Sequence, residues 1–414
     1  MKILVVSQYF WPEPFIINQL VDTLARQGHD ITVFTGKPNY PDGRIYEGFD
    51  QKGESAETFH DSVKVYRIPL RPRFSASSIN LALNYLSFIY SGLRCFPRLS
   101  RHLQADAILV FAPSPITSAI PAILIKFLRK WHLAIWVQDL WPESLAATGH
   151  VRNTKLLKAI GWLVKWIYSR ADTLLIQSRA FKDPVGEMAC AEKIVYYPNS
   201  ILKQSFDEKN DGNLPATLLQ QLKSSFSVVF AGNLGRAQSL ETIIEAAKQL
   251  NDIPDVRFFL IGSGSMSDWL AQQKVKYGLD NVVIAGRFPM DMMPNIYAHA
   301  DALLVTLTRD EIFALTVPSK IQAYLAAGKP IIAAVDGEGG RVVLEANAGL
   351  VSPAEDVHGL LSSIRTLTQM SPEERSELGE NAQEYFNQHF EMEGQARKLI
   401  EILSSRLPTV TERG

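Results

Sequence analysis

Short β-branched and aliphatic runs alternate with longer stretches of helical periodicity along the whole chain of 414 residues. Alternation of this kind predicts parallel sheets covered by crossover helices, which is an α/β architecture. In the first half we predict strands at Lys2–Ser7, Asp30–Thr35, Val63–Ile68, Ala107–Phe111, Leu133–Gln138 and Thr173–Gln177. In the second half we predict strands at Phe226–Ala231, Val256–Ile261, Val282–Ala285, Ala302–Thr306, Ile331–Ala334 and Gly349–Val351.

The polar stretch KQSFDEKNDGNLP, Lys203–Pro215, interrupts this alternation and predicts a linker. A chain of this length is also too long for one ordinary core. We therefore expect two α/β domains with a cleft between them, residues 1–202 and residues 203–389. The helical end of the chain, about residues 390–407, is predicted to pack back on the first domain, and the few residues after it are predicted to be loose.

Loops that follow parallel strands are the candidate sites, because ligands of open α/β sheets bind beyond the carboxyl ends of the strands. FAGNLGRAQSL places Gly232, Gly235 and Arg236 between a strand and a helix, and AAVDGEGG places Gly339 and Gly340 in a similar position. Glycine lets the backbone approach a phosphate, and a helix N-terminus offers free N–H groups to an anion. Ordinary strand-to-helix turns have the same outline, so these loops alone leave both interpretations open.

The stretch VPSKIQAYLAAGKP predicts a third anion-binding loop in the second half. A helix is expected to begin after Pro318, with Ser319 and Lys320 in its first turn, and Glu311 lies on the loop before it. A lysine on a helix is usually solvated. Beside the two glycine loops, however, we interpret Lys320 as a group that neutralises phosphate.

In the first half, WVQDLWPES places Gln138, Asp139 and Glu143 just after a buried strand. Carboxylates at such a position are candidates for proton transfer or hydroxyl recognition, although Asp139 is equally suited to cap the following turn. Two other loops of this half contribute further predicted acceptor-binding groups: Glu13, Asn18, Asn39 and Tyr40.

The sequence contains no pattern typical of a metal site or of a secreted disulfide framework. Cys95 and Cys190 are the only cysteines, and neither CxxC nor HxxxH spacing occurs. His29 is expected to mark a turn. The run MKILVVSQYF predicts a buried strand because it is too short for a signal-peptide core, and Lys126 interrupts AIPAILIKFL, the longest apolar run. These features favour a reducing, cytoplasmic compartment.

The net charge of −1 conceals a strong asymmetry. Residues 1–200 contain 23 Lys and Arg against 16 Asp and Glu, and residues 62–182 contain 17 basic residues against four acids. The basic segment predicts a polyanionic partner. A nucleic acid is disfavoured because no recognition motif accompanies the charge and the second half is acidic.

Two stretches of the basic segment have the composition of membrane-surface helices. NTKLLKAIGWLVKWIYSR, residues 153–170, combines an apolar stripe with lysines and with Trp162 and Trp166, and a similar apolar stretch spans 79–101. A basic amphipathic helix with tryptophans suits a bilayer interface, although a helix packed on a core would show the same stripe. We therefore predict an anionic membrane surface as a partner.

Nearly the whole chain resembles the retaining glycosyltransferases of family 4, which have the GT-B fold. The resemblance is carried by MKILVVSQYF, QGHDITVFTG, GNLGRAQSLETIIEAA and SKIQAYLAAGKP. More narrowly, YFWPEPFIINQL, TGKPNYPDG and VQDLWPES are similar to the branch of N-acetyl-L-fucosaminyltransferases of O-antigen and capsule assembly. The resemblance implies two Rossmann-like α/β domains that face each other across a cleft.

The resemblance further implies transfer from a UDP-sugar with retention of configuration, without a metal or another cofactor. The catalytic groups would be Asp139, Lys320 and Arg236. The second domain would bind the donor through Gly232, Asn233, Gly235, Arg287, Glu311, Thr316, Ser319, Gly339, Gly340 and Glu345. The first domain would bind the acceptor through Glu13, Asn18, Asn39, Tyr40, Gln138 and Glu143.

The chain departs from the family pattern in the residues expected to bind the donor. Most members carry two glutamates eight positions apart, but counting from Glu311 reaches Ser319, and counting back from AAGKP reaches Ala323 and Leu315. Three further departures follow the loops: Asn233 and Gln238 replace the usual Arg and Lys, and Gln138 replaces a His before Asp139. Arg236, Lys320 and Arg287 would then have to supply the charge.

These observations favour a membrane-peripheral glycosyltransferase on the inner face of the plasma membrane. Its donor would be a UDP-sugar, expected from the resemblance to be UDP-N-acetyl-L-fucosamine, and its acceptor a polyprenyl-diphosphate-linked sugar. Two alternatives stay open: a UDP-sugar 2-epimerase on the same fold, and a non-catalytic protein that binds nucleotide sugars.

Overall fold

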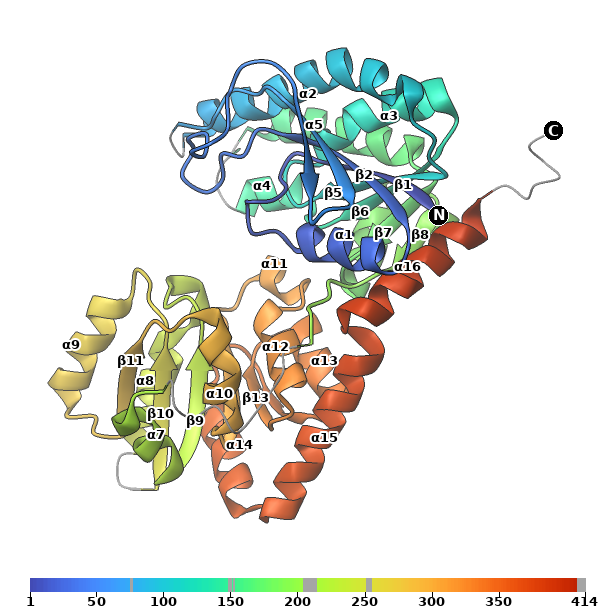
Figure 1. Cartoon of the computed structure of the whole chain (residues 1–414). Helices are drawn as coiled ribbons and strands as arrows, with labels where there is room; N and C mark the ends of the chain where they lie inside the picture. The colour runs from blue at the N-terminus through green and yellow to red at the C-terminus, as the bar shows by residue number, and fades with distance from the viewer. Residues whose placement is uncertain (75–76, 148–150, 152, 204–213, 251–254, 408–414) are drawn as a thin grey trace. The chain divides into compact units, whose positions relative to one another are not determined.

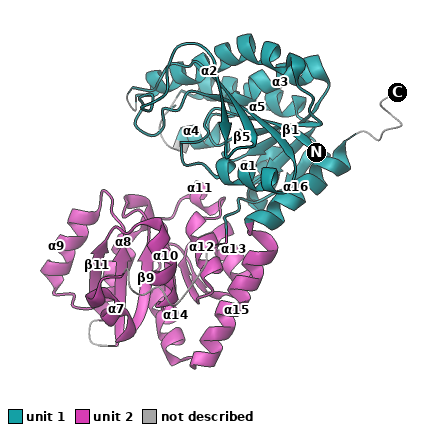
Figure 2. Cartoon of the chain, viewed as in Figure 1, with its two compact units in different colours: residues 1–202, 392–414 teal, residues 203–391 magenta. Residues whose placement is uncertain are grey.

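The computed structural model describes residues 1–74, 77–147, 151, 153–203, 214–250 and 255–407. They form two compact units, the first made of residues 1–202 and 392–414 and the second of residues 203–391 (Figure 2). Most of the predicted linker and the predicted loose end of the chain lie outside the described residues.

The first unit is built on an eight-stranded sheet of order β3-β4-β2-β1-β5-β6-β7-β8. Its strands are β1 (Lys2–Ser7), β2 (Asp30–Gly36), β3 (Ser55–Phe59), β4 (Val63–Ile68), β5 (Ala107–Ala112), β6 (His132–Val137), β7 (Thr173–Ile176) and β8 (Ile194–Tyr196). Neighbouring strands are parallel, except that β3 is antiparallel to β4. Because β1 pairs with both β2 and β5, the strand order reverses between β1 and β5. Ligands of such sheets bind at that reversal.

Helices cover both faces of this sheet (Figure 1). They are α1 (Ile16–Arg26), α2 (Ser78–Leu99), α3 (Ala119–Arg129), α4 (Glu143–Ala147), α5 (Thr154–Arg170), α6 (Lys182–Gly186) and α16 (Met392–Arg406). α1 and α16 contact each other, and Leu24 and Leu399 are buried in the same core. α2, α3 and α5 form the layer on the other face (Figure 1). There a Cβ on Gly92 would come within 2.6 Å of Pro121, so the glycine allows α2 to lie close to α3.

The second unit is built on a six-stranded parallel sheet of order β11-β10-β9-β12-β13-β14. Its strands are β9 (Phe226–Ala231), β10 (Val256–Ile261), β11 (Val282–Gly286), β12 (Ala302–Thr306), β13 (Ile331–Ala334) and β14 (Gly349–Ser352). Its helices are α7 (Ala216–Lys223), α8 (Leu240–Gln249), α9 (Ser267–Tyr277), α10 (Met293–Ala298), α11 (Glu311–Ala314), α12 (Ser319–Ala327), α13 (Glu338–Glu345), α14 (Val357–Gln369) and α15 (Pro372–His389). Here the order reverses between β9 and β12.

The predicted α/β architecture is confirmed, and each predicted strand is present with ends that differ by at most one residue. Two short strands were not predicted. β3 has the sequence SAETF and forms an edge of the sheet, and β8 has three residues and forms the opposite edge. Edge strands need less apolar sequence than central strands because only one neighbour covers them.

The helices include none that could span a bilayer within the part of the chain that the structure describes.

Candidate functional site

Lys320 occupies the carboxyl edge of the second sheet, in the first turn of α12. Gly232, directly after β9, has φ +139°, and a Cβ there would lie 2.6 Å from Cε of Lys320. Glycine is therefore needed at this position both for the backbone conformation and for the approach of the lysine. The predicted loop after β9 and the predicted loop that contains Lys320 therefore lie next to each other, at the point where the strand order reverses between β9 and β12.

The ammonium group of Lys320 has an unusual environment. It donates a hydrogen bond to Oε1 of Gln238 and lies 3.6 Å from the ring centroid of Phe230. No carboxylate among the described residues pairs with it. Burial lowers the pKa of Lys320 to about 7. A half-buried cation without a counter-ion favours the binding of an anion, which restores its charge.

An open pocket of about 580 Å³ adjoins the same loop. Its lining includes Arg236 and Ser239 from the loop after β9, Thr242 from the first turn of α8, and Trp269 from α9. Ser239 has a left-handed backbone conformation, with φ +44°, which turns the chain into α8. Arg236 and Lys320 thus belong to one loop region, since Gln238, the partner of Lys320, lies two residues after Arg236.

The glycines of the predicted loop AAVDGEGG allow close packing. A Cβ on Gly339 would lie 3.1 Å from Ile321 of α12, and a Cβ on Gly340 would lie 2.9 Å from Val351 of β14. Both glycines are buried in the first turn of α13. Their small size accounts for the close contact of α13 with its neighbours, and their predicted role in donor binding stays a prediction.

The remaining predicted donor-binding residues are dispersed. Thr316 hydrogen-bonds through its Oγ1 to the carbonyl of Phe313. Glu311 and Ser319 are exposed at the first residues of α11 and α12, and Asn233 and Arg287 are exposed on loops after β9 and β11. Glu345 corrects the prediction, because it lies at the last residue of α13 rather than at the edge where that helix begins. Its carboxylate accepts a hydrogen bond of 2.8 Å from the Tyr385 hydroxyl and pairs with Arg341 at 2.6 Å.

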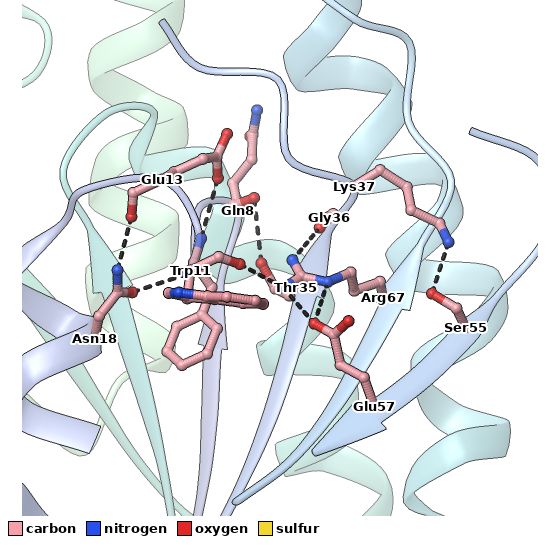
Figure 3. A network of polar contacts seen from close by, with 11 residues as sticks. Gln8, Trp11, Glu13, Asn18, Thr35, Gly36, Lys37, Ser55, Glu57 and Arg67 are labelled. Atoms are coloured by element: carbon pink, nitrogen blue, oxygen red, sulfur yellow. Dashed lines mark hydrogen bonds and ion pairs between the residues drawn. The ribbon is translucent and has the colours of Figure 1, made fainter. Parts of the chain in front are cut away.

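Glu13 organises the carboxyl edge of the first sheet (Figure 3). Its side chain is fully buried, and its two oxygens accept hydrogen bonds from the backbone N–H groups of Phe10, Asn39 and Tyr40 at 3.1, 2.8 and 2.7 Å. Burial raises its pKa to about 7, against the effect of these hydrogen bonds. The carboxylate therefore holds the loops after β1 and β2 together, which corrects its predicted role in contacting the acceptor.

Asn18 and Asn39 have similar supporting roles. Asn18 accepts a hydrogen bond of 3.0 Å from the Trp11 backbone and donates one of 2.7 Å to the Glu13 carbonyl (Figure 3). Asn39 is fully buried and donates to the Lys37 carbonyl at 3.1 Å. Both amides fix the loop geometry, and full burial keeps Asn39 from contacting an acceptor. Acceptor binding by the partly exposed Asn18 stays a prediction.

Arg67, at the end of β4, completes this network (Figure 3). Its side chain has no exposed surface, its Nε donates to Glu57 at 2.7 Å, and it also donates to the carbonyls of Gly36 and Trp11. A buried guanidinium is stabilised when a carboxylate and carbonyls take up its donors. Arg67 thereby connects its own strand, β4, to β2, to β3 and to the loop after β1.

Asp139 lies at the end of β6, half-buried, as the sequence predicted from its strand. Burial raises the pKa of Asp139, and the polar hydrogens of Ser144, Trp141 and the Leu140 backbone limit the rise. The amide nitrogen of Gln138 is buried without a hydrogen-bond partner among the described residues. Glu143 is exposed at the start of α4.

Arg73 was missed by the sequence interpretation, which counted it only in the basic segment. Its guanidinium carbon lies 5.1 Å from the ring centroids of Tyr9 and Tyr40 and 5.9 Å from that of Tyr85. It hydrogen-bonds to the Tyr9 hydroxyl, while its buried Nε has no partner within the described residues. Burial raises the pKa of Tyr85, the charge of Arg73 opposes that rise, and the charge of Asp139 adds to it. The sequence contained one signal of this cage, because Tyr9 follows β1 and Tyr40 follows β2.

No group of three or more His, Cys, Asp and Glu side chains that could hold a metal ion occurs in the described parts of the chain. The residues gathered at both carboxyl edges are instead suited to bind anions and hydroxyl groups.

Two family models match the two halves of the chain. The glycosyl transferase 4-like domain matches residues 16–200, and the glycosyl transferases group 1 model matches residues 220–385. These ranges fall within the first and the second unit, respectively.

Similar proteins agree with these matches. The colanic acid biosynthesis glycosyl transferase WcaI of Escherichia coli is 27% identical over 344 residues, which is 79% of this chain and 82% of WcaI. The probable glycosyltransferase WbjE of Pseudomonas aeruginosa is 24% identical over 346 residues, 81% of this chain and 85% of WbjE. The crystal structure of Anabaena HepE in complex with UDP superimposes with a TM-score of 0.67 over 98% of this chain and 100% of that chain, at 18% identity. The chain is therefore a glycosyltransferase with a GT-B fold, composed of a 4-like domain followed by a group 1 domain.

Proposed function

We propose that this protein is a retaining glycosyltransferase that transfers a sugar from a UDP-sugar to a polyprenyl-diphosphate-linked saccharide during assembly of a surface polysaccharide. The single observation that carries the proposal is Lys320, a half-buried cation without a carboxylate partner among the described residues, next to a glycine at the strand reversal. A diphosphate is the anion that suits such a position. The name of WcaI and the UDP bound to HepE support the pathway and the nucleotide.

The proposed reaction needs no metal. The acceptor hydroxyl attacks the anomeric carbon on the face from which the diphosphate leaves, the bond between that carbon and the β-phosphate oxygen breaks, and the hydroxyl proton passes to the departing diphosphate. Lys320 and Arg236 stabilise the negative charge that develops on the leaving group. Asp139, with its raised pKa, orients a hydroxyl group of the donor sugar or of the acceptor.

On the acceptor side we assign a role to Arg73. Its guanidinium has no carboxylate partner in the described chain, and its Nε lacks a hydrogen bond. The diphosphate of a lipid-linked acceptor would supply the missing acceptor oxygens. The donor sugar is proposed to be N-acetyl-L-fucosamine, on the resemblance of YFWPEPFIINQL and VQDLWPES alone.

The proposal is tested by measuring UDP release and product mass for a panel of UDP-sugars, with and without a polyprenyl-diphosphate-linked N-acetylglucosamine acceptor. We expect release that requires the acceptor, from one donor, with a mass gain of one sugar. Interconversion of UDP-sugars without an acceptor would indicate the epimerase instead. Donor binding without release or interconversion would indicate a nucleotide-sugar-binding protein without catalytic activity.

A further inference from the structure

A second pocket, of about 1,090 Å³, lies in the first unit on the side away from the proposed acceptor site. Its lining includes the C-terminal ends of α3 and α5, together with His132 and Asp172, which stand at the starts of β6 and β7. Because the strands are parallel, these residues mark the amino edge of the sheet. Ligand pockets usually have volumes of about 300–1,000 Å³, so this pocket can accept a sizeable ligand.

The charge of this pocket is strongly positive. Five Lys and Arg side chains line it, against the single carboxylate of Asp172. The cations are Lys126, Lys130, Arg170, Lys193 and Arg406. This composition selects an anionic ligand.

Three of these cations are already occupied. Arg406 donates to the Glu192 carbonyl at 2.7 Å. Lys126 donates to the Arg170 carbonyl at 2.7 Å and to Asp172 at 2.6 Å. Lys193 donates to the carbonyls of Ser169 and Ala171 at 3.0 and 2.7 Å. Both lysines thereby complete the C-terminal end of α5, which leaves backbone carbonyls without helical partners.

Lys130 and Arg170 are the two exposed cations that remain available. Each is exposed, and no carboxylate among the described residues pairs with either. Lys130 lies 4.9 Å from the ring centroid of Phe127, and the Arg170 guanidinium lies 5.9 Å from that of Trp166. These aromatic contacts stabilise a cation without using up its hydrogen-bond donors.

The rim of the pocket is apolar and faces solvent. Phe127 is 70% exposed, Trp166 40% and Leu93 38%, and Trp162, one turn before Trp166 on α5, is 79% exposed. Large apolar side chains in this number are unfavourable in water and are typical of an interaction surface. Tryptophan and lysine side by side are typical of the boundary between lipid headgroups and acyl chains.

We infer that this pocket binds an anionic phospholipid of the membrane, with the lipid phosphate between Lys130 and Arg170 and its acyl chains along Leu93, Phe127 and Trp166. The inference deepens the membrane association that the sequence predicts for the first unit, and rests on it together with the proposed use of a lipid-linked acceptor. It adds a defined headgroup site at the amino edge of the sheet, whereas the proposed acceptor site lies at the carboxyl edge.

The test uses the full chain and flotation with vesicles of phosphatidylcholine, with or without one quarter phosphatidylglycerol. The variant Lys130→Glu/Arg170→Glu is compared with Lys52→Glu/Lys182→Glu, which makes the same change of charge at two exposed positions of the same unit outside the pocket. We expect the pocket variant to lose at least 30-fold in affinity for the anionic vesicles and the control variant to lose less than fivefold. Equal losses in both variants would overturn the inference, because they would indicate diffuse attraction.

A second variant, Phe127→Ser/Trp166→Ser, tests the acyl-chain contacts. At 0.5 M salt, where surface attraction is screened, wild-type protein should retain part of its vesicle binding and this variant should retain none. The inference would be overturned if this variant bound the vesicles as well as wild type does. It would also be overturned if the wild-type protein bound equally well to vesicles without anionic lipid, or bound single-stranded DNA in preference to vesicles. Circular dichroism melts show whether the variants fold.

The same preparations separate this inference from the proposed function. If the pocket variant loses vesicle binding but keeps wild-type transfer to a water-soluble acceptor, both stand. If vesicle binding depends on the pocket and no donor supports transfer, the proposed function fails and the lipid site stands. If transfer is measured and vesicle binding is indifferent to the pocket, the lipid site alone fails.

Discussion

The charged side chains at the carboxyl edges of the two sheets differ in whether hydrogen bonds and ion pairs satisfy them. In the first unit Glu13 and Arg67 are fully buried, and hydrogen bonds or an ion pair satisfy both. In the second unit Lys320 is half-buried against Phe230, and its only hydrogen-bond partner in the described residues is the neutral amide of Gln238.

This difference distinguishes charged side chains that hold the fold together from charged side chains that are suited to bind a ligand. A buried charge that meets fixed partners holds loops in place, and its removal leaves its partners unsatisfied. A buried charge without a counter-ion destabilises the free protein and is stabilised by an incoming anion. The charges at the first edge thus keep the loops in place, whereas binding of an anion is expected to stabilise the second edge. Arg73 and its tyrosine cage show that the first edge also contains one cation of the second kind.

The largest effect is expected for Lys320→Met. Loss of a charge that stabilises the leaving group should lower kcat/KM by about 10²–10³-fold or more. The thermal midpoint of the free protein should stay unchanged or rise, because an uncompensated buried charge is removed. UDP-release kinetics and a thermal melt measure both; Lys248→Met, at an exposed ion pair with Glu245, is the control. A strong fall in the melting temperature would contradict the comparison.

Next comes Arg67→Met, which probes the opposite behaviour. It leaves Glu57 and two backbone carbonyls without their partner, so the first unit should lose about 3–5 kcal/mol of stability. Urea unfolding monitored by tryptophan fluorescence gives the change. Arg98→Met, which breaks an exposed pair with Glu54, should cost less than about 1 kcal/mol. Similar costs for the two variants would remove the distinction between buried and exposed pairs.

The affinity for UDP should depend on pH through Lys320. Its pKa is about 7 in the free protein and should rise when a diphosphate binds, so UDP binding takes up protons near and above neutral pH. Between pH 7 and 9 the affinity should fall by about tenfold per pH unit until the pKa of the complex is reached. Titration calorimetry in buffers of different ionisation enthalpy detects the uptake. Lys320→Met should lack this pH dependence, and a persistent dependence would assign it to another group.

A smaller effect is expected for Arg73→Gln. The KM for a diphosphate-linked acceptor should rise about tenfold, corresponding to one lost charge-assisted hydrogen bond. Donor affinity should stay constant, and an acceptor glycoside without phosphate should show no change. Equal losses with both acceptors would indicate that Arg73 only supports the tyrosine cage.

The smallest effect concerns Glu13. Its pKa in the folded protein, about 7, exceeds its ordinary value of 4.5, so the folded state holds an extra proton between these pH values. Its contribution to stability is therefore present below pH 4.5 and is lost as the pH rises through 7. The thermal midpoint of wild type should fall over this interval relative to that of Glu13→Gln. Parallel pH profiles of the two proteins would show that Glu13 keeps an ordinary pKa.

Sequence patterns predicted the strands well because a buried central strand must be apolar along its whole length. β9 and β10 are examples, with FSVVFA and VRFFLI matching the predicted bounds. The capping box of Ser371 and Glu374 at the start of α15 is equally local, and the structure shows both of its hydrogen bonds. β3 could not be predicted in this way, because its alternating exposure reflects an edge position that only the neighbouring β4 defines.

The candidate site divides along the same line. The position of Lys320 and Asp139 after strands was visible in the sequence, because a parallel sheet puts the ends of its strands on one edge. The sequence did not reveal that Glu13 would be saturated by backbone N–H groups, since those groups belong to loops that follow different strands. The same holds for Arg73, whose three tyrosines come from separate segments.

The α/β class, the twelve predicted strands and the excess of positive charge in the first domain were predictable from the sequence, because hydrophobic periodicity and composition are local properties. Which charges are satisfied could be seen only in the folded protein. That property depends on the distance between groups far apart in the chain, and it distinguishes Glu13 and Arg67, which hold the fold, from Lys320, Arg73, Lys130 and Arg170, which remain available to anions.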